Sequence, residues 1–199
     1  MSDVLSGLSR QFDSNAIGAL AEQIGADHAQ TQSAVQAALP MLIAALAKNS
    51  GQPGGAAALR GALDQHDGGI LDDILSAFGQ RATAATGGAI LGHVLGSRQA
   101  PMEQALSGMS GLSSQSAGKL LALLAPIIMG YLGRQARQQG FDAGSLASML
   151  GQADTHARAQ QPAGGSLLTS LLDKDGDGSI VDDLGQMGMG ILGGFLNKH

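Results

Sequence analysis

The sequence predicts an all-α fold: a duplicated multi-helix unit packed as one domain, plus a C-terminal helix–loop–helix with an EF-hand-like acidic loop. Three observations lead to this prediction. The 199 residues are 44% hydrophobic but only 3% aromatic, so residues that favour strands are scarce. Apolar residues recur at helical spacing through most of the chain. Two long apolar segments also resemble each other at a constant offset along the chain.

The first helices are predicted between residues 14 and 48. A capped helix begins near residue 14 and ends at Gly25. Asp27 then opens a second helix, whose helical spacing continues to Lys48. Pro40 lies inside this second helix and should kink it or mark a break.

Residues 49–55 form a loop rich in glycine, and a short helix follows it. An acidic segment comes next, which we interpret as a joint between helices and alternatively as a vestigial acidic loop. Further short helices are expected around residues 70–78 and 87–96, separated by a small, polar stretch at 79–86. The carboxylates of the acidic segment are Asp64, Asp67, Asp72 and Asp73.

An offset of 86 residues places Gly25 on Gly111 and Pro40 on Pro126 without a gap. We therefore interpret residues 14–78 and 100–151 as two copies of one helical unit, within a helical domain that covers residues 1–151. Residues 152–165 are predicted to be a linker. Residues 166–199 are predicted to form a helix, an acidic loop and a second helix.

The acidic loop has alternating aspartates followed by Gly178, which matches the first half of an EF-hand calcium loop. Its second half departs from that pattern, because Leu184 stands where a bidentate glutamate is expected. One of two later aspartates would have to complete the coordination, so weaker binding than in a sensor site is expected. The alternative is a polar turn before a helix start, where aspartates favour the helix dipole. The predicted Ca²⁺ ligands are Asp173, Asp175, Asp177, Ser179 and either Asp182 or Asp183.

The net charge of −5 makes a general nucleic-acid binder unlikely on electrostatic grounds, since phosphate contacts need clustered lysine and arginine. Without cysteine, disulfides and thiolate chemistry are excluded. No signal peptide is recognised, which leads us to expect a cytoplasmic protein. The longest apolar run, residues 120–133, contains a proline and falls short of the about 20 residues that span a membrane, so no transmembrane segment is expected.

Three stretches carry a family resemblance: residues 87–96 with their repeated glycines, the Leu-Ala-Pro-Ile segment at 124–127, and residues 66–73. Together they resemble the bacterial domain-of-unknown-function family 937, to which the small YidB-like proteins are similar as distant relatives. The resemblance covers about residues 5–152. It implies an all-helical bacterial protein and brings no catalytic residue with it.

The sequence thus predicts a non-catalytic helical protein that binds calcium and acts by protein–protein contact or self-association. One alternative is a DNA-binding module, because residues 20–26 and the following helix loosely resemble a helix-turn-helix. An unrecognised enzyme is the other alternative. His28, His66 and His93 lie far apart in the sequence and form no recognisable catalytic pattern.

Overall fold

The computed structural model describes residues 4–64, 69–72, 74–78 and 81–160. Every regular element in these ranges is a helix, which confirms the all-α prediction for this part of the chain. The chain divides into two units, Met1–Thr155 and His156–His199, and the description below concerns the first. The elements are α1 (Val4–Ser9), α2 (Ser14–Ile24), α3 (His28–Ser50), α4 (Gly55–Asp64), η1 (Gly69–Leu71), α5 (Ile74–Phe78), α6 (Arg81–Leu95), η2 (Gly96–Arg98), α7 (Gln99–Ser110), α8 (Ser114–Gln139) and α9 (Ala143–Gln160).

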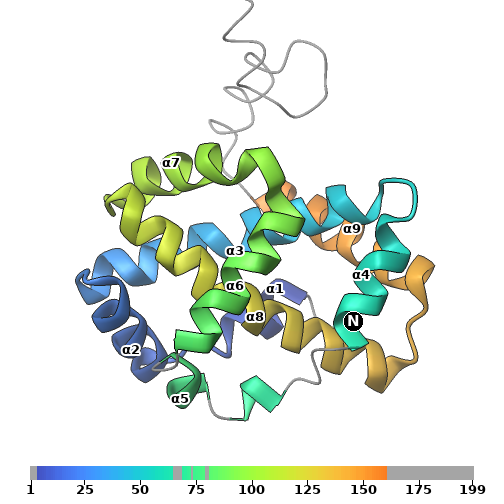
Figure 1. Cartoon of the computed structure of the whole chain (residues 1–199), viewed down its shortest axis with the longest axis horizontal. Helices are drawn as coiled ribbons and strands as arrows, with labels where there is room; N and C mark the ends of the chain where they lie inside the picture. Colours follow the sequence, from blue (N-terminus) through green and yellow to red (C-terminus); the bar gives the residue numbers. More distant parts are fainter. Residues whose placement is uncertain (1–3, 65–68, 73, 79–80, 161–199) are drawn as a thin grey trace, which may run out of the picture. The chain divides into compact units, whose positions relative to one another are not determined.

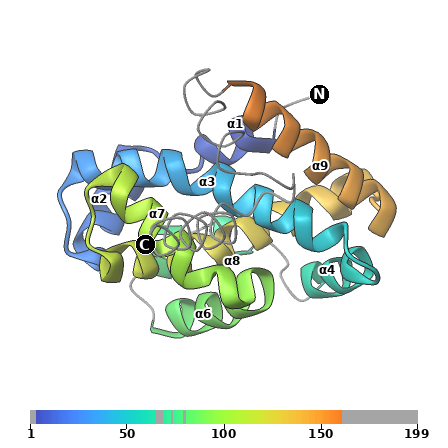
Figure 2. The same cartoon turned by 90° about the horizontal axis from the view of Figure 1, so that it is seen from above.

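The first unit is built around α8, which packs against α6, α7, α2, α3, α4 and η1 (Figure 1). Figure 2 shows α3 and α8 lying between α1 and α6. A single cluster of buried aliphatic side chains joins these helices, and Phe78 is the aromatic ring most deeply enclosed in it. The scarcity of aromatic residues is thus compatible with a continuous core, because leucine, isoleucine and alanine fill the space between closely packed helices.

The helix ends agree with the local signals in the sequence. Asp27 caps α3 by accepting a hydrogen bond from the Gln30 amide at 2.8 Å. Ser113 caps α8 in the same way, with its hydroxyl 3.0 Å from the Ser116 amide. The helices before them, α2 and α7, end at Gly25 and Gly111, whose φ angles of 70° and 73° are left-handed. Glycine adopts this conformation without the steric cost that a Cβ atom brings.

Both internal prolines lie within continuous helices. Pro40 is inside α3 and Pro126 is inside α8. The expected break at Pro40 is therefore absent, and α3 runs unbroken to Ser50. A proline removes one backbone hydrogen bond. Buried apolar side chains lie on both sides of each proline, Leu39 and Leu42 around Pro40 and Ala125 and Ile127 around Pro126, and their burial offsets the lost bond.

Helix α6 begins at Arg81 and so extends into residues 79–86, where the sequence suggested a small, polar connection. Residues 81–86 include three alanines and an arginine, which favour a helix, so the local propensity accounts for the earlier start. Packing on α8 concerns the glycines that follow. A Cβ atom added to Gly87 would lie 1.6 Å from the carbonyl oxygen of Ala122 in α8, so the two backbones are almost in contact. Gly87 is thus required for this helix crossing.

Helix α9 continues to Gln160 and therefore includes residues 152–160, which the sequence suggested as the start of a linker. Alanine, glutamine and arginine dominate this stretch, and all three favour a helix. Pro162 and the following glycines come only after the end of α9. The division between the two units falls at Thr155 and His156, within α9.

Among the described helices, α8 alone is long and apolar enough to cross a membrane by length and composition. However, 78% of its most apolar window is buried inside the first unit. This burial is consistent with the expectation of no transmembrane segment, since the core helix of a helical bundle has the same composition.

Candidate functional site

The predicted calcium loop lies outside the described residues. This applies to all six predicted ligands: Asp173, Asp175, Asp177, Ser179, Asp182 and Asp183. Calcium binding by this loop therefore stays a prediction. Within the part of the chain that the structure describes, no group of three or more histidine, aspartate or glutamate side chains is arranged to hold a metal ion.

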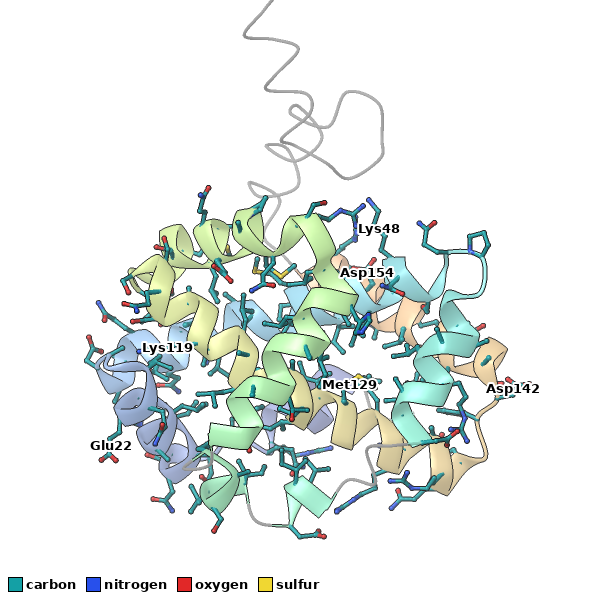
Figure 3. All side chains as sticks on the ribbon, in the orientation of Figure 1. Glu22, Lys48, Lys119, Met129, Asp142 and Asp154 are labelled. Carbon is teal, nitrogen blue, oxygen red and sulfur yellow. The ribbon has the colours of Figure 1, made fainter. Side chains whose placement is uncertain are left out.

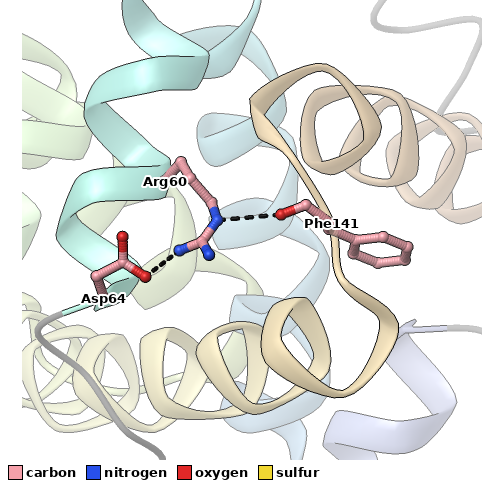
Figure 4. Close-up of polar contacts among 3 residues, drawn as sticks. All are labelled: Arg60, Asp64 and Phe141. Carbon is pink, nitrogen blue, oxygen red and sulfur yellow. Dashed lines mark hydrogen bonds and ion pairs between the residues drawn. The ribbon is translucent and has the colours of Figure 1, made fainter.

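The upstream acidic segment is described at Asp64 and Asp72, whereas Asp67 and Asp73 lie outside the described residues. Asp64, at the end of α4, forms an ion pair with Arg60 one turn earlier. The Nε atom of Arg60 also donates to the carbonyl oxygen of Phe141, 3.0 Å away in the connection between α8 and α9 (Figure 4). The Asp64 carboxylate thus holds an arginine that links α4 to that connection.

Asp72 is engaged in a similar way. Its carboxylate lies 2.6 Å from a guanidinium nitrogen of Arg134 in α8. Both described carboxylates of the segment therefore already face an arginine. Both ion pairs are exposed, so each contributes little to stability, and binding of a metal ion by Asp64 and Asp72 would compete with them.

The described histidines are not brought together. The His28 ring lies 3.3 Å from the Ser14 carbonyl oxygen, at the start of α3. His93 is near the other end of α3, where the Asn49 side chain donates to its carbonyl oxygen. At 1.5 Å per residue, the 21 residues between positions 28 and 49 separate the two histidines by about 30 Å. His66 lies outside the described residues.

The helix pair that loosely resembled a helix-turn-helix is formed by α2 and α3, with Gly25 in the turn between them. One face of α3 is buried in the core, and its exposed residues include His28, Gln32 and Gln36. Lys48 is the one lysine or arginine of α3 and lies near its C-terminal end. The end of α3 that would have to read a DNA groove therefore supplies no lysine or arginine for phosphate contacts.

A polar hollow of about 390 Å³ lies where the ends of α3 and α6 meet. The hollow is bordered by Lys48, Asn49 and Gln52 on one side and by residues 93–98 on the other. Figure 3 shows Lys48 at the surface beside the corner where α6 leads into α7. The sequence did not reveal this arrangement, because its two sides are more than 40 residues apart. The only available signal was a basic residue near the predicted end of each helix.

One titratable group among the described residues has a shifted pKa with a clear cause. The Asp142 carboxylate caps α9, accepting a hydrogen bond from the Ser145 amide at 2.7 Å. Hydrogen bonds from the Ser145 backbone and side chain lower the pKa of Asp142 below its ordinary value, because they stabilise the charged form. This shift belongs to a helix cap and does not indicate a catalytic group.

The described part of the chain is thus an all-α protein whose polar features are caps, ion pairs and one hollow. The chain belongs to the family described as "Bacterial protein of unknown function (DUF937)", whose profile matches residues 6–135. This confirms the family resemblance of the three stretches noted in the sequence. No curated protein and no solved structure gave a significant match to the chain.

Proposed function

We propose that this protein is a non-catalytic member of its family that binds calcium through the C-terminal acidic loop and acts through contacts with other proteins or with itself. The proposal is carried by one observation, the alternation of Asp173, Asp175 and Asp177 before Gly178. Three carboxylates at alternate positions repel one another unless a cation lies among them.

Five carboxylates of the described residues already serve as helix caps or ion-pair partners, which leaves the acidic loop as the better candidate for binding calcium. Asp13, Asp27 and Asp142 cap helices, and Asp64 and Asp72 pair with arginines. Five of the sixteen acidic residues of the chain fall between positions 173 and 183. The acidic loop therefore has the highest density of potential oxygen ligands in the sequence.

We also propose that the helical domain is a duplicated unit. The caps at Asp27 and Ser113 and the left-handed glycines at Gly25 and Gly111 are each 86 residues apart. The same offset relates Gly54 to Gly140, with φ angles of 75° and 64°. These matches support the duplication through the conformation of the backbone as well as through composition.

Calorimetric titration of the full chain with calcium tests the calcium assignment. The expected result is a saturable heat for the native protein and its loss in Asp175→Asn. Glu22→Gln is the matched control, because it removes a surface carboxylate on α2 in the same way (Figure 3). At a hundredfold excess of calcium over its dissociation constant, the native state should gain about 2.7 kcal/mol over the protein in chelator. If there is no heat and no change in melting temperature, the acidic loop is a plain polar turn.

Analytical ultracentrifugation with and without calcium tests self-association. A sedimentation coefficient that rises with protein concentration supports contact between copies of the chain. A monomer at all concentrations in both conditions would leave other proteins as the partners.

A further inference from the structure

We propose that the hollow between the ends of α3 and α6 is a binding site for a small oxyanion, a phosphate or a carboxylate. Its two sides come from separate parts of the chain and are tied together. The Asn49 side-chain amide donates to the carbonyl oxygens of His93 and Val94, at 3.2 and 3.5 Å. The hollow is therefore held open by a contact between two long helices of the unit.

The charge of the hollow opposes the charge of the chain. Lys48, His93 and Arg98 border it, and neither aspartate nor glutamate does. The chain as a whole carries more acidic than basic residues, with a net charge of −5. The positive charges of Lys48 in α3 and Arg98 in η2 thus lie at one place on an acidic protein, which favours anions there.

Stabilisation of helix ends explains where each basic residue stands in its own helix, but not why these ends meet at one hollow. Lys48 lies in the last turn of α3 and Arg98 in the last turn of η2, where a positive charge interacts favourably with the helix dipole. These two ends come from separate parts of the chain, and both border the hollow.

The size and the polar groups of the hollow define the ligand class. The hollow has a volume of about 390 Å³ and is open to solvent, so it can contact a small polar group without enclosing it. The guanidinium of Arg98 can bind two oxygens of a phosphate or carboxylate at once. Asn49, Gln52 and Ser97 add polar side chains around it, and Leu95 is buried beneath. The hollow suits an oxyanion on a small molecule.

Titration of the full chain with inorganic phosphate, followed by amide NMR spectra, tests the site. A parallel titration uses acetate, and chloride at the same ionic strength is the reference. We expect saturable shifts confined to the amides around positions 48–52 and 93–99. The phosphate and acetate series then show which oxyanion the site prefers.

Arg98→Gln should weaken the binding at least tenfold, which is the effect of losing one charged hydrogen bond of about 1.4 kcal/mol. Lys119→Gln is the control, since it removes an exposed positive charge of α8 that does not border the hollow (Figure 3). An unchanged melting temperature of Arg98→Gln establishes that the variant is folded, and Asn49→Ala provides a second test of the same site. Shifts that never saturate, that also appear with chloride, or that persist in Arg98→Gln would overturn the proposal.

Discussion

Residues 14–64 and residues 99–150 have the same succession of local structures but very different burial. Each region has a helix that ends at a left-handed glycine, a capped long helix with an internal proline, a second left-handed glycine and a third helix. In α3 the buried residues recur every three or four positions and form one face. In α8 every residue from Leu123 to Gly133 is buried.

This difference shows that local sequence signals determine where a helix begins and ends, whereas the surrounding helices determine how deeply it is buried. Glycines and caps determine where α3 and α8 begin and where the preceding helices end. The depth of burial depends on what packs around each helix. α8 is covered by the 15-residue α6, whereas α1, which packs on α3, has only six residues.

The largest expected effect comes from shortening a core side chain at matched positions of the two long helices. Ile127 in α8 is fully buried, and Met41, 86 residues earlier in α3, is only partly buried. Ile127→Ala should lower the free energy of unfolding by about 2–5 kcal/mol. Met41→Ala should cost under about 2 kcal/mol, because part of the side chain already faces water. Urea denaturation measures both, and equal losses would contradict the difference in burial.

The second largest loss of stability is expected from a substitution in α6, the helix that covers α8. Gly87→Ala should destabilise the protein by about 1–3 kcal/mol, because the new methyl group would overlap the Ala122 carbonyl oxygen. Gly88→Ala is the neighbouring control, since nothing lies within 4 Å of its added Cβ atom. This control should be neutral or stabilising by up to about 1 kcal/mol through better helix propensity. A neutral Gly87→Ala would mean that α6 does not approach α8 closely.

A smaller effect, equal in the two regions, is expected at the helix ends. Gly25→Ala and Gly111→Ala each place an alanine in a left-handed conformation, which costs about 1–2 kcal/mol. Gly18→Ala in the middle of α2 should instead be stabilising, because its surroundings are open and its helix gains propensity. Thermal melting of the three variants measures the effects. Clearly unequal losses at Gly25 and Gly111 would show that the two turns are not equivalent.

The same division explains what could be predicted from the sequence. The all-α class, the end at Gly25 and the start at Asp27 follow from residues close together in the chain, and the structure agrees with them. The helix through Gly87 and Gly88 was expected, but the start of α6 at Arg81 was missed, although three alanines and an arginine in residues 81–86 favour a helix. Pro40 was expected to kink the helix or mark a break, and the break is absent because burial around it outweighs one missing hydrogen bond.

The candidate site was harder to predict from the sequence than the fold. Asp64 and Asp72 were recognised as acidic. Of their two partners, only Arg60 could be identified from the sequence, because it lies one helical turn from Asp64. Arg134, the partner of Asp72, could not. The hollow joins two helix ends through Asn49 and the carbonyl oxygens of His93 and Val94. Backbone carbonyl groups have no identity in a sequence, so contacts of this kind become visible only once the helices are packed.

The smallest expected effect is a dependence on pH that belongs to the second region alone. Asp142 caps α9, whereas the position 86 residues earlier, near the start of α4, is Ala56. Because folding lowers the pKa of Asp142, its charged form stabilises the native state above the ordinary value of 3.8. That contribution is lost as the pH falls through the lowered pKa of the folded protein.

Asp142→Asn keeps an oxygen that can accept the Ser145 hydrogen bond but removes the titration. The variant should therefore melt slightly below the native protein at neutral pH, and the difference should shrink as the solution is acidified below the folded pKa. Melting curves across this pH range measure it, and Glu22→Gln, which removes an exposed carboxylate of α2, is the control for the loss of a charge. A difference that stays constant with pH would mean that the charge on Asp142 contributes nothing to the cap. If the difference in melting temperature from the native protein shrinks equally in both variants, the effect comes from net charge. The cap at Asp142 would then give the second region no pH dependence of its own.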